Sequence, residues 1–226
     1  MILLVTDTSG KNGTVALAHA GERNSHDAEV MEVAPLAGGT FSAQLVPQIA
    51  ALLSRHGLSK RDIDAFVVVS GPGSFTGLRV GLAAIKALAE ILRKTIVPVS
   101  LLELLALASS VQGKVVAVLD GGRGEVYFGA YEIAGGSIHP LREELLSKTE
   151  FLSAAQDSQV TTSDLLLAAL AREAGLSASV VEAPSAAMIA RFGWKKLQAG
   201  ETVSPEQLEA NYMRRSDAEL FVKKSF

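Results

Sequence analysis

Two aspartates stand where a phosphate or metal site could form. Asp7 follows the apolar run ILLVT and Asp120 follows the run VVAVL, and a glycine-rich turn comes after each of them. Carboxylates at two strand ends, facing one another across a cleft, could position a metal-bound phosphate. The alternative is that each side chain caps its own turn by accepting a backbone hydrogen bond. The sequence leaves both interpretations open.

The stretch SGPGSFTGLR, Ser70–Arg79, is a second candidate, because its glycines could hold a phosphate at the start of a helix. A Walker A loop requires a lysine directly after its last glycine, whereas Gly77 is followed by leucine. A dinucleotide-binding turn requires the spacing GxGxxG, and after Gly71 and Gly73 the third glycine comes one residue late. We therefore favour a tight turn and close helix packing, with a serine or threonine as helix cap and an anion site as the alternative.

The residue types most often used in catalysis and metal binding show no recognisable site motif in this sequence. The chain has no cysteine, which excludes thiol catalysis, disulfides and thiolate metal sites. No serine lies in a GxSxG elbow, and no two histidines have the HxxxH spacing of a helical metal site. We expect neither catalytic residues nor a metal site. The histidines are His19, His26, His56 and His139.

The elements that carry the two aspartates look like copies of one another. Ile2–Glu22 and Val115–Gly136 both contain an apolar strand, an aspartate, a glycine-rich turn and a returning strand with alternating polarity, which predicts two hairpins. Their aspartates are about half the chain length apart, which favours a duplicated α/β unit. We expect two lobes, residues 1–108 and 109–226, with the last residues as candidates to return to the first lobe.

Strands and helices alternate between the hairpins, which predicts an α/β fold with a mixed sheet. The expected elements are a helix at Gln44–His56, a strand at Ala65–Ser70, and helices at Thr76–Arg93 and Leu101–Ala108. Because Pro47 has no backbone N–H, the first helix should start late or bend there.

The helix Thr76–Arg93 has more apolar surface than one buried stripe requires. Its charged residues fall in one narrow sector at 100° per residue, and nearly all its other positions are Gly, Ala, Val, Leu or Ile. Gly77, Gly81 and Ala84 form a path of small residues where another backbone could come close. The second apolar face is covered either by a helix of the same chain or by a partner protein.

Composition limits the class of partner. Lys and Arg number 21 against 24 Asp and Glu, and a net charge of -3 gives no electrostatic footprint for avid nucleic-acid binding by this chain alone. The N-terminal MILLVTDTSG has no basic leader, and no apolar run is long enough to span a bilayer. These features predict a cytoplasmic protein that makes no membrane contact.

Four segments in order resemble the TsaB (YeaZ) family, the partner subunits in the synthesis of threonylcarbamoyladenosine on tRNA. The segments are LLVTDTSGKNGTVALA, VVVSGPGSFTGLRVGLAAIKALA, DGGRGEVYFGAY and EANYMRR. The resemblance implies an actin-like ATPase (ASKHA) fold, with two lobes built from a duplicated unit of mixed sheet and helices. It implies vestigial phosphate loops at Asp7, Thr8, Ser9, Asp120, Gly121 and Gly122.

The resemblance also implies a role without catalysis. The chain would be a scaffold that pairs with a TsaD-like catalytic subunit and enables recruitment of a TsaE-like ATPase. That complex transfers threonylcarbamoyl to N6 of adenosine 37 in tRNA. Independently of the resemblance, the excess apolar surface on Thr76–Arg93 predicts that the chain forms a homodimer when it lacks a partner. The implied partner interface consists of Gln48, Leu52, Phe75, Gly77, Leu78, Gly81, Leu82, Ala84, Ile85 and Leu88.

Two departures from the family pattern stand out. Phe41 replaces a frequent histidine at the entry to the first docking helix, and DGGRG replaces the usual Asp-Ala-Arg of the second loop. We therefore expect no tightly held cofactor and at most weak ATP or ADP binding. An independent small-molecule kinase or ATPase of the same fold is the alternative function, whereas a protease is disfavoured because no nucleophile–base pair is visible. Direct tRNA contact at Arg214, Arg215, Lys223 and Lys224 stays an open question.

Overall fold

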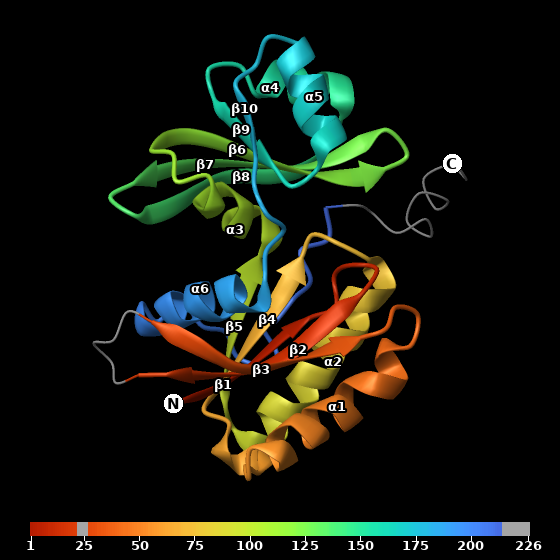
Figure 1. Cartoon of the computed structure of the whole chain (residues 1–226), viewed down its shortest axis with the longest axis vertical. Helices are drawn as coiled ribbons and strands as arrows, with labels where there is room; N and C mark the ends of the chain where they lie inside the picture. The colour runs from red at the N-terminus through yellow and green to blue at the C-terminus, as the bar shows by residue number, and fades with distance from the viewer. Residues whose placement is uncertain (22–26, 214–226) are drawn as a thin grey trace. The chain divides into compact units, whose positions relative to one another are not determined.

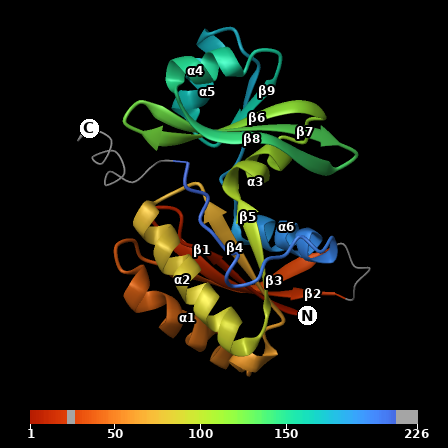
Figure 2. The same cartoon turned by 180° about the vertical axis from the view of Figure 1, so that it is seen from behind.

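A computed structural model describes residues 1–21 and 27–213, which form two compact units (Figures 1 and 2). The first unit comprises Met1–Leu104 and Pro184–Ala210, and the second comprises Leu105–Ala183 together with the described residues 211–213. The first unit thus ends inside the helix α3 (Leu101–Ala108), four residues before the expected boundary at 108. The segment that returns to it is α6 (Ala186–Gln198) with the chain that follows, because α6 packs across the first sheet. Residues 214–226, the expected returning end, lie outside the described residues.

The first unit is built on a mixed sheet of five strands in the order β3-β2-β1-β4-β5. The predicted first hairpin is confirmed, since β1 and β2 pair antiparallel, and β3 extends the meander. β4 and β5 join β1 in parallel. The strands are β1 (Ile2–Asp7), β2 (Gly13–Ala20), β3 (Ala28–Leu36), β4 (Ala65–Gly71) and β5 (Thr95–Ser100).

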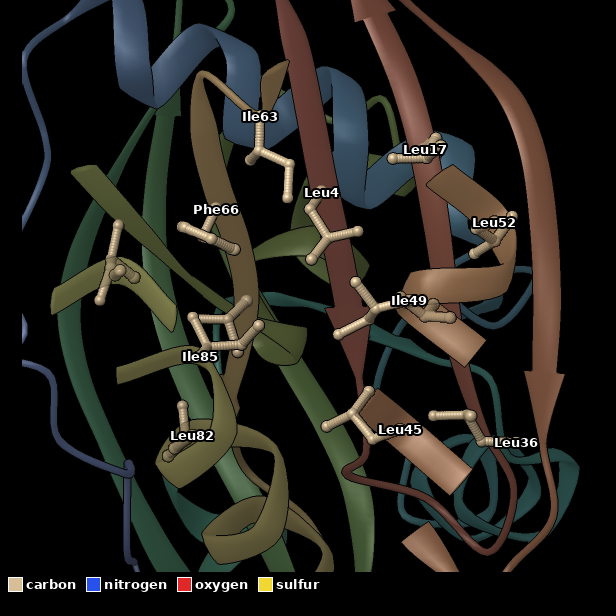
Figure 3. Packing of buried hydrophobic residues seen from close by; sticks show 14 of the residues in the cluster. Leu4, Leu17, Leu36, Leu45, Ile49, Leu52, Ile63, Phe66, Leu82 and Ile85 are labelled. Atoms are coloured by element: carbon tan, nitrogen blue, oxygen red, sulfur yellow. The ribbon is translucent and has the colours of Figure 1, made fainter. Parts of the chain in front are cut away.

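Helices cover both faces of this sheet. Figures 1 and 2 show α1 (Phe41–Arg55) and α2 (Phe75–Leu92) on one face and α6 on the other. Between the sheet and the α1–α2 pair lies an apolar core that contains Leu4, Phe66 and Ile85 (Figure 3). A short 3-10 turn, η1 (Lys60–Asp62), connects α1 to β4.

The helix α1 begins earlier than the sequence suggests. It starts at Phe41 and continues through Pro47, so the expectation of a late start is wrong. Pro47 is exposed, which lets water satisfy the carbonyl that loses its helical N–H partner. Burial of Phe41, Leu45, Ile49 and other side chains on the opposite side outweighs the low helix propensity of proline.

The second unit repeats this topology. Its strand order is β10-β9-β6-β7-β8, with β6, β7 and β8 antiparallel and β9 and β10 parallel to β6, which matches the first sheet strand for strand. The predicted duplication of a mixed α/β unit is therefore confirmed. The elements are β6 (Gly113–Gly122), β7 (Glu125–Ala134), β8 (Ser137–Ser147), α4 (Lys148–Ala154), β9 (Gln159–Thr162), α5 (Leu165–Glu173) and β10 (Ala178–Val180).

Within the described ranges, no helix combines the length and the apolar composition needed to cross a lipid bilayer.

Candidate functional site

Each of the two strand-end aspartates caps its own turn. The Asp7 Oδ1 accepts hydrogen bonds from the backbone N of Ser9 at 2.9 Å and from its Oγ at 2.5 Å. The Asp120 Oδ1 accepts one from the backbone N of Gly122 at 3.2 Å. Of the two interpretations that the sequence left open, the structure bears out the turn-capping one for each carboxylate.

The residues beside Asp7 are covered by the start of α2. Thr8 and Ser9 are only 2% and 5% exposed. The backbone N of Ser74 donates to the Ser9 carbonyl oxygen at 2.6 Å, and the Ser74 Oγ caps α2 by accepting from the backbone N of Gly77 at 3.3 Å. Ser74 is thus the helix cap, and the hydroxyl of Ser9 is committed to Asp7.

The glycines of the loop allow this close approach. A methyl group added at Gly77 would lie 2.1 Å from the carbonyl oxygen of Thr8, and one added at Gly81 would lie 2.2 Å from the Thr8 Oγ1. A methyl group at Gly73 would lie 2.5 Å from the Ser9 carbonyl oxygen. The expected role of these glycines in close packing is borne out, and the backbone they meet belongs to the same chain.

Most residues of the implied partner interface are internal. Phe75 is 38% exposed, and the Arg79 guanidinium stacks on its ring at 3.7 Å. Gln48, Ala84 and Leu88 are half-buried. The others are buried and stabilise the unit itself, so only the four partly exposed members of the implied set stay accessible to a partner. The buried residues are Leu52, Gly77, Leu78, Gly81, Leu82 and Ile85.

The solvent side of α1 and α2 carries small and apolar residues that, apart from Pro47, the sequence interpretation did not single out. Val46 on α1 is 52% exposed and Ile91 on α2 is 73% exposed. A helical wheel could have identified these positions as exposed only if the side of each helix that faces the sheet had been known. We call this set the α1–α2 face, and it consists of Ala43, Val46, Pro47, Ala50, Ala83, Ala87 and Ile91, all of them exposed.

Among the residues that the structure describes, no three His, Asp or Glu side chains lie close enough together to hold a metal ion. His26 and the basic positions Arg214, Arg215, Lys223 and Lys224 lie outside the described residues.

Comparison with known protein families gives one extended match. The family model of TsaD, tRNA N6-adenosine threonylcarbamoyltransferase, matches residues 33–218. Among curated relatives, the chain is 28% identical to the tRNA threonylcarbamoyladenosine biosynthesis protein TsaB of Escherichia coli, over 96% of both chains. It is 34% identical to the TsaB proteins of Haemophilus influenzae and Bacillus subtilis, over 57% and 60% of this chain. Those two matches span little more than half of the relatives, 52% and 57% of their length.

Solved structures show the same fold. YeaZ from Pseudomonas aeruginosa superposes with a TM-score of 0.72 at 24% identity, covering 93% of this chain and 99% of that one. A second structure, described as an uncharacterised protein with similarity to the peptidase YeaZ, also has a TM-score of 0.72, at 27% identity and with coverage of 94% and 99%.

Proposed function

This chain belongs to the TsaB (YeaZ) family of tRNA threonylcarbamoyladenosine biosynthesis proteins, and we propose that it acts there as a partner subunit without catalytic activity of its own. In this proposal it docks onto a TsaD-like subunit, which transfers threonylcarbamoyl to N6 of adenosine 37 in tRNA. The TsaE-like ATPase and the tRNA then bind to the complex of the two subunits.

The duplicated unit is the actin-like ATPase fold that the resemblance implied. In this chain, both strand-end aspartates are engaged in their own turns, and Thr8 and Ser9 are buried beneath α2. These contacts support a structural role for the loops.

The α1–α2 face is the observation that carries the proposal. α1 and α2 pack side by side on the sheet and expose Val46 and Ile91 beside several alanines. Apolar patches of this kind on a folded domain favour a protein interface, and alanines allow helices of a partner to approach closely. In the absence of its partner, the same face would form an isologous homodimer, because a two-fold contact needs only one self-complementary patch.

Ala83→Arg is expected to weaken binding to the TsaD-like subunit at least tenfold. The substitution places a long charged side chain on the proposed α1–α2 face without touching the core, since Ala83 is exposed. Binding is measured by calorimetry, and tRNA modification is assayed with each subunit omitted in turn. Ala169→Arg is the matched control, because Ala169 is an exposed alanine on α5 in the second unit.

Equal binding by both arginine variants, with an unchanged mass in light scattering, would contradict docking through this face. Modification activity that persists when this chain is omitted would contradict the role as a required subunit.

For the nucleotide, we expect ATP to bind the isolated chain no more tightly than roughly 1 mM, or about 4 kcal/mol. The reason is that Asp7, Thr8 and Ser9 are occupied by contacts within the first unit. Calorimetry with ATP and Mg²⁺ measures the affinity. Micromolar binding, or ATP turnover that Asp7→Ala abolishes, would instead favour the independent kinase or ATPase.

A further inference from the structure

A pocket of about 390 Å³ opens on the first unit between the C-terminal half of α1, the loop to η1, and α2. Its floor is formed by Ile49 and Leu53, each only 4% exposed, which belong to the core beneath. Leu58 and Leu88 are half-buried and form its walls, and Val46 is an exposed residue at its edge. The remaining lining residues are Ala50, Ser54, Gly57, Ser59 and Lys60.

The end of α1 explains why one wall of the pocket is apolar. Gly57 has a φ of 65°, and its backbone N donates to the Ser54 carbonyl oxygen at 3.1 Å. The backbone N of Leu58 donates to the Leu53 carbonyl oxygen at 2.9 Å. This is a Schellman ending, which satisfies the terminal carbonyls and brings the two leucine side chains together. The helix end therefore presents methyl groups to the pocket.

One positive charge accompanies these apolar walls. The backbone N and the Oγ of Ser59 both donate to the Asp62 Oδ2, at 2.7 and 2.8 Å, and these bonds hold the pKa of Asp62 below its usual range. Ser59 is thus committed to its own turn. Lys60 is exposed, and it makes no ion pair or side-chain hydrogen bond with any residue in the described ranges. Among the described residues, it is the only charged one that lines the pocket.

We infer that this pocket binds a small amphiphilic anion, an aliphatic chain that ends in a carboxylate. The chain would lie against Ile49, Leu53 and Leu88, and the carboxylate would pair with Lys60. The volume falls in the range of small-molecule sites, which combine apolar walls with few polar groups. The inference goes beyond the proposed function and concerns the chain without its partner, because Val46 and Ala50 belong both to the pocket lining and to the α1–α2 face.

Octanoate is the probe for this site. Titration into the full chain should shift the methyl NMR signals of Leu53, Leu58 and Leu88 saturably, with half-saturation at roughly 1 mM. Leu165 and Leu166, which are 73% and 80% exposed in the second unit, serve as internal controls and should not shift. The titration is repeated in the Ala83→Arg background, so that a dimer covering the pocket does not hide binding.

Two substitutions on the same exposed side of α1 test the location. Ala50→Phe fills the pocket and should weaken octanoate binding at least tenfold. Ala43→Phe adds the same ring two turns earlier, outside the lining residues, and should leave binding unchanged. An equal effect of the two variants, or no saturable shift in either background, would overturn the site.

The headgroup is tested by comparing octanoate with octanol. Lys60→Gln should weaken octanoate about threefold, the size of an exposed ion pair, and leave octanol unaffected. An equal effect on both ligands would overturn the assignment of a carboxylate. If octanoate produces no shift while Ala50→Phe changes the mass in light scattering, the pocket holds a side chain of a second copy and the ligand inference fails.

Discussion

Gly77→Ala is expected to destabilise the first unit by about 3 kcal/mol, at the upper end for overpacking a core. The added methyl group would lie 2.1 Å from the carbonyl oxygen of Thr8, and a backbone atom held in a strand-end turn cannot move aside cheaply. An ordinary helix position would gain about 1 kcal/mol from the same change. Urea unfolding followed by the fluorescence of Trp194, the single tryptophan and a buried residue of this unit, measures the loss.

Gly81 provides the matched comparison. A methyl group there would meet the Thr8 side chain, with Oγ1 at 2.2 Å and Cγ2 at 3.3 Å, so Gly81→Ala should cost about 2 kcal/mol. Thr8→Ala removes both atoms and keeps only the Cβ at 3.2 Å, so it should rescue most of the Gly81→Ala loss. It should not rescue Gly77→Ala, whose clash is with the backbone. The double-mutant cycle therefore separates the two contacts. Rescue of both variants, or of neither, would contradict this packing.

This packing also decides which variants can report on partner binding. A bulky residue at Gly81 would disturb the contact with Thr8 before it reached any partner. Loss of binding in such a variant would reflect misfolding. Ala83, which is exposed on the same helix, avoids this difficulty.

Lys196→Met is expected to destabilise the first unit by about 3 kcal/mol, because it removes the Lys196 countercharge from the nearly buried carboxylate of Glu103. The Lys196 Nζ lies 3.3 Å from the Glu103 Oε2, and the two side chains are only 14% and 12% exposed. This ion pair joins α6 to α3 across 93 residues of sequence. Chemical denaturation monitored by far-UV circular dichroism measures the loss.

The double variant Lys196→Met with Glu103→Met should recover most of that stability, since two apolar side chains of similar length replace the pair. Glu201→Gln is the exposed control. Glu201 also lies 3.2 Å from the Lys196 Nζ but is 59% exposed, so the change should cost less than about 1 kcal/mol. A Lys196→Met effect as small as that of Glu201→Gln would show that solvent screens the buried pair.

The sequence alone determined the elements whose signals are local. Alternating strands around glycine turns predicted both hairpins, and a cap followed by a long apolar run predicted a helix at 76–93, within one residue of α2 at each end. The similarity of the two hairpins, whose aspartates are about half the chain length apart, predicted the duplication that the two sheets display. These features depend on residues close together in the chain, where turn chemistry and periodicity act directly.

Only the tertiary structure decided which side of α2 is buried. The helix is apolar around most of its circumference, so periodicity could not choose between two faces, and residues implied as a partner surface turned out to be core. Three features join residues that are distant in sequence. They are the contacts of Gly77 and Gly81 with Thr8, the return of α6 to the first sheet, and the pocket shared by α1, η1 and α2. No local signal encodes such contacts, because their energy arises only when the whole unit packs.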